Sequence, residues 1–228
     1  MPAQNTPLSC QCLRLLAALT FNTYGRIVAN MARESLRNDI LDAGLQVMFR
    51  KGFSAGVRDI VAAANAPQGS FTNHFRSKEA FACEVLDRYF EYVRQLVSQA
   101  LDDERLPART RLRRYLDLIT ERLAKDGFAR GCLIGDFSLE TAQTSEVLRR
   151  RLVAIYAEWK KPFAACIRQA QAAGEIPGTF PPDDLAEFLL ASWQGAILRM
   201  KVERTAKPLE RFKRIAFKTI FAPVRAAR

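Results

Sequence analysis

Residues 57–79 decide the fold, and they run Val-Arg-Asp-Ile-Val-Ala-Ala-Ala-Asn-Ala-Pro-Gln-Gly-Ser-Phe-Thr-Asn-His-Phe-Arg-Ser-Lys-Glu. Two short stretches with helical apolar spacing, 57–64 and 67–75, flank a tight turn, which is the pattern of a helix-turn-helix. Asn65 tolerates the left-handed backbone that such a turn requires. The sequence therefore predicts a helix-turn-helix. The small residues where the helices cross are Ala63 and Ala64, and the buried apolar anchors are Ile60, Phe71 and Phe75.

The second helix of such a motif enters the major groove of DNA, and the residues near its N-terminus face the base edges. In this chain these positions hold Gln68, Ser70, Thr72 and Asn73, whose hydroxyl and amide groups are of the types that read bases. Gly69 lets the backbone come close to DNA, and a helix N-terminus favours a phosphate. The segment is therefore predicted to bind double-stranded DNA.

The stretch from residue 64 to residue 79 resembles the DNA-binding signature of the TetR/AcrR family of bacterial transcription factors. The resemblance is strong over residues 33–100 and covers the remainder by length and helix order. It implies that Lys78 binds a phosphate and that His74 is more often a packing or backbone contact than a base reader. The predicted DNA-contacting residues are Ser54, Arg58, Gln68, Gly69, Ser70, Thr72, Asn73, His74 and Lys78.

Three features depart from the family's pattern. Asn65 stands where the family usually has glycine, which is harmless because asparagine also adopts the left-handed conformation. Thr72 stands where the family usually has a tyrosine that contacts phosphate and base, so the predicted DNA interface is thinner. The loop 52–56 is one residue short of the usual pattern. This leaves open whether Ser54 or Gly56 caps the next helix.

From residue 31 onward the chain is predicted to be all-α, because glycines and prolines fall between segments with helical periodicity. Ser77, Ser145 and Asp183 are expected to be N-caps. Together with the resemblance, this predicts an N-terminal three-helix helix-turn-helix domain at 31–80, a helical ligand-binding and dimerisation domain at 81–222, and a basic tail at 223–228. Residues 1–30 contain no acidic residue and are expected to be a disordered or loosely helical extension, or a start codon assigned too far upstream.

Composition excludes several classes of protein. The 228 residues are 49% apolar and 26% charged, as in a soluble globular protein, and the apolar run 15–19 is too short to span a bilayer. His74 is the single histidine, which excludes a His-rich metal site, and no nucleotide-binding glycine loop is present. Five irregularly spaced cysteines are a poor disulfide framework and favour a reducing compartment. We therefore predict a cytoplasmic protein that is not an enzyme and needs no metal or cofactor.

The formal net charge of +11 is unevenly distributed. Residues 31–80 carry seven basic and five acidic residues, whereas residues 199–228 carry ten and two. The largest positive excess therefore lies at the C-terminal end. It fits either an ordinary solvated helix face or a salt-sensitive, sequence-blind attraction to DNA.

The second half is similar to the part of TetR/AcrR proteins that forms a ligand pocket and a dimer interface. Residues 131–140 resemble a subgroup that includes the N-ethylmaleimide-responsive repressor NemR, in which some members sense electrophiles or oxidants at the cysteine matching Cys132. The alternative is a small buried thiol. The predicted ligand or redox residues, which could also be plain core, are Cys132, Phe128, Phe137, Tyr156, Trp159 and Cys166, with Phe163 and Trp193 as further candidates.

Together these features predict a dimeric, sequence-specific transcriptional repressor whose affinity for DNA is lowered by an apolar or electrophilic small-molecule inducer. The resemblance implies that helices near 183–204 and 209–221 pair with their copies as a four-helix bundle, which requires a near-palindromic operator. Three other functions stay open. They are a non-specific architectural DNA-binding protein, an enzyme acting on an aromatic substrate, and a membrane-surface protein anchored by residues 13–21.

Overall fold

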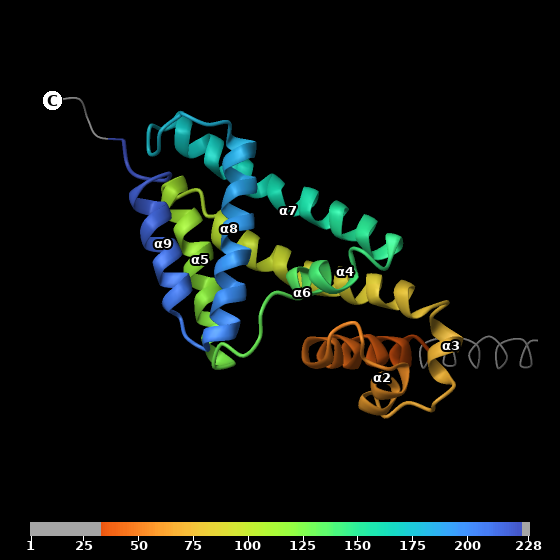
Figure 1. Cartoon of the computed structure of the whole chain (residues 1–228). Coiled ribbons are helices and arrows are strands. Elements are labelled where there is room, and N and C mark those ends of the chain that lie inside the picture. Colours follow the sequence, from red (N-terminus) through yellow and green to blue (C-terminus); the bar gives the residue numbers. More distant parts are fainter. Residues whose placement is uncertain (1–32, 225–228) are drawn as a thin grey trace, which may run out of the picture.

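The computed structural model describes residues 33–224, and every regular element in this range is a helix (Figure 1). This confirms the all-α prediction. Residues 1–30, the proposed anchor at 13–21 and the last four residues of the basic tail lie outside the described range. After a first helix at 33–51, the elements are α2 (Val57–Ala63), α3 (Ser70–His74), α4 (Lys78–Leu101), α5 (Ala108–Lys125), α6 (Leu133–Thr141), α7 (Glu146–Ala172), α8 (Pro182–Glu203) and α9 (Lys207–Lys218).

The turn between α2 and α3 is a complete helix C-cap. Asn65 has φ +51°, its N–H donates to the Ala62 carbonyl at 3.1 Å, and the Ala66 N–H donates to the Val61 carbonyl at 2.9 Å. These two hydrogen bonds define a Schellman motif, which is normally completed by glycine. The left-handed backbone predicted for Asn65 is therefore confirmed.

The structure decides which residue caps α2 and shows that α3 is shorter than the predicted helix at 67–75. Gly56 is the N-cap of α2, and its N–H donates to the Asp59 carboxylate at 3.2 Å, whereas the Ser54 hydroxyl donates to the Lys51 carbonyl. The helix predicted from Pro67 begins only at Ser70, because residues 67–69 form a turn closed by the Ser70 N–H on the Pro67 carbonyl. Only a short helix of five residues is therefore presented by this motif.

The two longest helices, α4 and α7, pack against each other and run from the helix-turn-helix end of the molecule into a bundle formed with α5, α8 and α9 (Figure 1). The predicted N-caps Ser77 and Ser145 are confirmed, since their hydroxyls accept the Ala80 and Leu148 N–H groups. The predicted cap at Asp183 is wrong. Pro181 is the N-cap of α8, and Asp183 lies in the first turn, where its charge suits the helix dipole.

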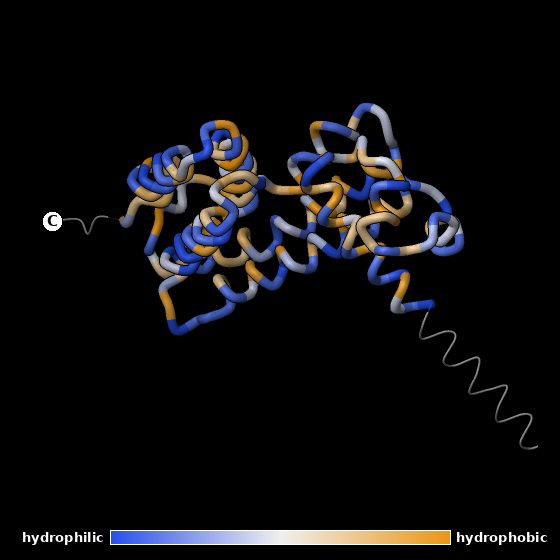
Figure 2. The backbone as a smooth tube through the Cα atoms, turned by 90° about the horizontal axis from the view of Figure 1, so that it is seen from below, coloured by the Kyte–Doolittle hydropathy of each residue, from blue (hydrophilic) through white to orange (hydrophobic). Residues whose placement is uncertain are grey.

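Apolar positions recur along each helix and converge on the interior (Figure 2). One continuous cluster of buried residues extends from Ile40 in the first helix to Phe221 after α9. At the helix-turn-helix end, the rings of Phe71, Phe75 and Phe81 contact one another in tilted and edge-on arrangements, with ring centroids 4.7–5.2 Å apart. The helix-turn-helix and the C-terminal bundle therefore share a core, so a change of packing in one part can reach the other.

Candidate DNA-binding surface and ligand cavity

The predicted DNA-contacting residues lie on and around α2 and α3 and differ in exposure. Six of them are exposed to solvent: Ser54, Arg58, Gln68, Gly69, Thr72 and Asn73. Ser70, by contrast, is only 7% exposed, so its hydroxyl is turned into the domain. The Thr72 hydroxyl donates to the Gly69 carbonyl at 3.0 Å, which fixes its side chain at the exposed start of α3.

His74 and Lys78 are both half-buried. Burial, followed by the nearby Arg33 and Arg37 guanidinium groups, lowers the pKa of His74, so the imidazole is neutral at neutral pH. Whether His74 makes a packing or backbone contact or reads a base stays a prediction. Lys78 lies at the start of α4 with its Nζ 4.5 Å from the centroid of the Phe53 ring, a cation–π contact that holds this ammonium group near the loop before α2.

A cavity of about 420 Å³ lies where the first helix meets the C-terminal bundle. The first helix contributes Leu45, Gln46 and Phe49 to its lining. Helices α4, α5, α7 and α8 and the connection 126–132 contribute the rest. Its size is that of a small-molecule site. Its walls are strongly aromatic, with Phe49, Tyr89, Tyr92, Tyr115, Trp159 and Trp193.

The structure separates the predicted ligand residues into three groups. Cys132 and Trp159 line the cavity, whereas Tyr156 lines a smaller neighbouring cavity of about 210 Å³ that Cys132 also borders. Phe128, Phe137 and Cys166 line neither cavity. Phe128 lies in the turn after α5, Phe137 stacks edge-on against Phe53 with centroids 6.0 Å apart, and the Cys166 thiol donates to the Ala108 carbonyl.

Several cavity residues carry no sequence signal that would single them out. Tyr89 and Tyr115 follow the ordinary apolar spacing of α4 and α5, and Gln194 is one polar residue on an otherwise mixed helix. Their shared role depends on three helices meeting. Sequence reasoning therefore found the cysteine and both indoles, Trp159 and Trp193, and missed the tyrosines and the amide around them.

Cys132 is the N-cap of α6 and is 7% exposed. Burial raises the pKa of its thiol, and the nearby Gly135 N–H, Gln194 amide and Tyr89 hydroxyl oppose this shift without cancelling it. The pKa of Tyr89 is likewise raised, chiefly by burial. The thiol is therefore protonated at neutral pH.

Three polar groups of cavity-lining side chains are buried without a hydrogen-bond acceptor in the described part of the chain. They are the indole N–H groups of Trp159 and Trp193 and the amide nitrogen of Gln194. Each unsatisfied group costs roughly 1–3 kcal/mol. The cavity wall can therefore offer donors to a neutral oxygen acceptor of a ligand.

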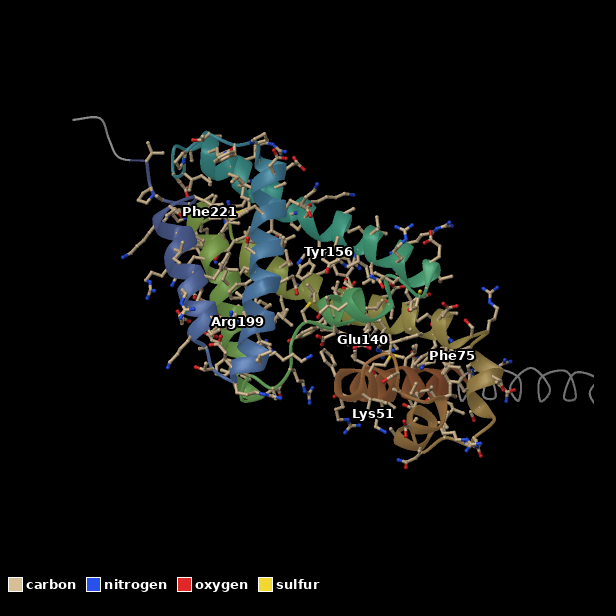
Figure 3. The ribbon with its side chains drawn as sticks, viewed as in Figure 1. Lys51, Phe75, Glu140, Tyr156, Arg199 and Phe221 are labelled. Atoms are coloured by element: carbon tan, nitrogen blue, oxygen red, sulfur yellow. The ribbon has the colours of Figure 1, made fainter. Side chains whose placement is uncertain are left out.

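Helix α6 connects the cavity with the helix-turn-helix. Its N-cap residue, Cys132, lies on the cavity wall. Near its other end Glu140 accepts a hydrogen bond from the Phe53 N–H, with nitrogen and oxygen 2.6 Å apart (Figure 3). A Cβ atom at Gly52, which has φ +70°, would overlap the Glu140 carboxylate. The loop before α2 is thus fitted closely to the end of α6.

Comparison with known families agrees with this architecture. Residues 40–85 match the family described as bacterial regulatory proteins, tetR family, and residues 108–216 match the tetracyclin repressor-like, C-terminal domain. The chain belongs to the TetR family. Its family and its relatives are transcriptional regulators with a DNA-binding helix-turn-helix, and not enzymes.

This TetR-family regulator is similar to several curated proteins. It is 46% identical to the HTH-type transcriptional repressor DhaR of Mycobacterium sp. (strain GP1), over 83% of this chain and 94% of DhaR. It is 37% identical to the transcriptional regulator AcuR of Cereibacter sphaeroides, over 82% and 84% of the two chains. NemR of Escherichia coli (strain K12), also a repressor by name, is 29% identical over 76% of this chain and 88% of NemR.

Solved structures show the same fold. The regulatory protein TetR from Rhodobacter sphaeroides superposes with a TM-score of 0.74 at 37% identity, over 78% of this TetR-family chain and 95% of that one. The reduced form of Escherichia coli NemR gives a TM-score of 0.75 at 26% identity, over 83% and 100%. Between residues 33 and 224, none of the helices has the length and apolar character needed to cross a membrane.

Proposed function

We propose that this protein is a dimeric, sequence-specific transcriptional repressor of the cytoplasm, whose affinity for its operator falls when a small molecule occupies the 420 Å³ cavity. Residues 31–80 would bind DNA, and residues 81–222 would bind ligand and form the dimer. One observation carries the proposal. The cavity is lined both by the first helix of the helix-turn-helix domain and by Cys132, the N-cap residue of α6, and α6 ends against the loop before α2.

The mechanism is a shift of population between two packings. A ligand that fills the cavity favours the packing in which the first helix and α6 make room for it. The Glu140–Phe53 contact then carries that change to the loop that precedes α2. The affinity for DNA falls by at most the ratio of the ligand's affinities for the two packings. By linkage, bound DNA lowers the affinity for the ligand by the same factor.

Support for dimerisation comes from the outer face of α8 and α9. Phe188 and Ile215 are 45% and 53% exposed there, and they line a groove of about 340 Å³ between the two helices. Leu198 and Val202 are further exposed apolar side chains of α8. An apolar face of this kind fits a second copy of itself about a two-fold axis. Two α3 helices would then meet two half-sites of a near-palindrome.

Support for repression rather than activation comes from the relatives, since DhaR and NemR are both named repressors. The buried, protonated Cys132 favours non-covalent binding over capture of an electrophile. The set of DNA contacts that we propose consists first of the exposed residues at the start of α3, Gln68, Gly69, Thr72 and Asn73.

The test is a gel-shift titration against the DNA upstream of the protein's own gene and against an unrelated duplex, at one moderate salt concentration. Selective binding of the upstream DNA is the expected result. Equal affinity for both duplexes would instead support the architectural DNA-binding alternative. Repeating the titration with N-ethylmaleimide on wild type and on Cys132→Ser separates the two inducer types, because only thiol sensing makes alkylation release DNA in the wild type alone.

A further inference from the structure

The mouth of the 420 Å³ cavity carries a cluster of positive charge. Arg122 and Lys125 on the last turn of α5 are exposed, and Arg130 lies in the loop that follows. We call these three side chains the basic rim. Within residues 33–224, Arg122 and Lys125 form no ion pair, whereas Arg130 lies 3.7 Å from the Asp126 carboxylate. Two cations of the basic rim are therefore free to bind an anion.

The inner wall of the same cavity has the opposite character. Tyr115, Trp159 and Trp193 are at most 3% exposed, and Cys132 is 7% exposed. Burial is the main reason why the pKa of Tyr115 and that of the Cys132 thiol are raised, which shows that this wall opposes negative charge. The cavity is thus apolar and aromatic inside and cationic at its mouth.

We propose that this cavity selects an organic acid with an aromatic or apolar body, and that the ligand's carboxylate lies at the basic rim while its body lies among the buried aromatic side chains. The inference deepens the proposed function, because it names the chemical class of the inducer for the same cavity. The orientation follows from the two ends of the cavity. A carboxylate placed inside would lose its hydration without gaining a cation, whereas at the rim it keeps water and gains the cations.

Two nearby features oppose an anion at the mouth, and neither is large enough to prevent binding. Asp126 adds one negative charge, and the C-terminal end of α5 contributes about half a charge more. The three positive charges of the basic rim still exceed the negative charge of Asp126 and the helix end together. Exposed ion pairs are individually weak, so the two free cations together should raise the affinity for a carboxylate by about two- to thirtyfold.

Intrinsic fluorescence offers a direct readout, because the chain contains two tryptophans and both line this cavity. We would titrate the full-length protein with 3-phenylpropanoate, 3-phenylpropanamide and 3-phenylpropylamine, which share a ring and a chain but differ in charge. The carboxylate should bind most tightly and the amine most weakly, and added salt should narrow the difference. Equal affinity for the three probes, or no fluorescence response to the carboxylate, would overturn the proposal.

A pair of double variants tests whether the basic rim is responsible. R122Q/K125Q should remove most of the preference for the carboxylate over the amide, measured as the ratio of the two affinities in the same variant. R150Q/K161Q is the matched control, since it removes the same charge from α7 at positions that do not line the cavity. An equal loss in both doubles would assign the preference to the protein's overall charge and contradict the proposal.

Measuring operator binding by fluorescence anisotropy with the same probes separates this inference from the proposed function. If the carboxylate is preferred but leaves operator binding unchanged, the charge preference stands and the role of the cavity in induction fails. If the three probes release DNA with equal affinity, the induction role stands and the charge preference fails.

Discussion

The Cys132 thiol is held in its protonated form by its surroundings, and its reactivity should therefore depend steeply on pH. Burial raises its pKa above the ordinary thiol value, so the thiolate that attacks N-ethylmaleimide is scarce at neutral pH and increases as the solution becomes more basic. We expect slow alkylation at neutral pH and a large acceleration in base. Peptide mass spectrometry over time at several pH values measures it.

A small free thiol in the same reaction is the control for the reagent. The half-buried Cys83, whose pKa is also raised by burial, is an internal comparison in the same chain. Fast alkylation of Cys132 near neutral pH, with little change in base, would mean that the thiolate is already formed. It would also favour the electrophile-sensing interpretation.

The left-handed backbone at Asn65 should make stability depend on the residue at this position. Its φ of +51° costs an ordinary side chain about 1–2 kcal/mol, which asparagine partly avoids and glycine avoids fully. Asn65→Ala should therefore lower the free energy of unfolding by about 1 kcal/mol, and Asn65→Gly should change it by only a few tenths. Urea denaturation of the three proteins measures both. An alanine variant as stable as the wild type would contradict the conformation described for this turn.

Helix α6 couples ligand binding to DNA binding only if the contact between Glu140 and the Phe53 N–H carries the change of packing to the loop before α2. Glu140→Ala removes the acceptor of the Phe53 N–H and should leave ligand binding, measured by tryptophan fluorescence, unchanged. The ratio of DNA affinities without and with ligand should shrink severalfold, because single coupling residues typically contribute about 0.5–2 kcal/mol. Anisotropy titrations with the best-binding probe give this ratio.

The matched control for Glu140 is Glu91→Ala on α4, since the Glu91 carboxylate pairs with Arg94 on its own helix. It removes an equal charge and should leave the ratio as in wild type. A Glu140→Ala protein that responds to ligand as fully as the control would mean that the signal passes by another route, such as the contact of Phe49 with Tyr89.

Sequence reasoning succeeded where an element is determined by its own residues. Ser77 and Ser145 cap their helices, and Asn65 ends α2, because each effect involves backbone groups within a few positions. It failed where two nearby residues can each occupy the N-cap position, as at the start of α8, where Pro181 and not Asp183 is the N-cap. Membership of the cavity was the hardest property to predict, because it depends on which faces of five separate helices meet.

At the scale of the whole molecule, the exposed apolar face of α8 and α9 predicts the oligomeric state. Ile215→Glu places a charge where a second copy would pack, and should weaken the dimer by at least about thirtyfold if Ile215 is central to the interface. Val153→Glu is the control, since Val153 is 57% exposed but lies on α7. Light scattering after size exclusion should show a monomer for Ile215→Glu alone, and the persistence of a full dimer would move the interface elsewhere.

In each protomer the helix-turn-helix shares its core with the C-terminal bundle, so a dimer formed through the bundles would hold its two α3 helices at a fixed spacing. Five base pairs inserted between the operator half-sites turn one half-site by about half a helical turn, which places it on the far side of the duplex from its α3 helix. Binding should then fall toward the level of an unrelated duplex, and insertion of ten base pairs should recover part of it. A protein that bound DNA only through general positive charge would be indifferent to both insertions, because that attraction does not depend on where the half-sites lie. The dependence on helical phase therefore separates a specific dimeric regulator from an architectural binder even though both carry the same net charge of +11.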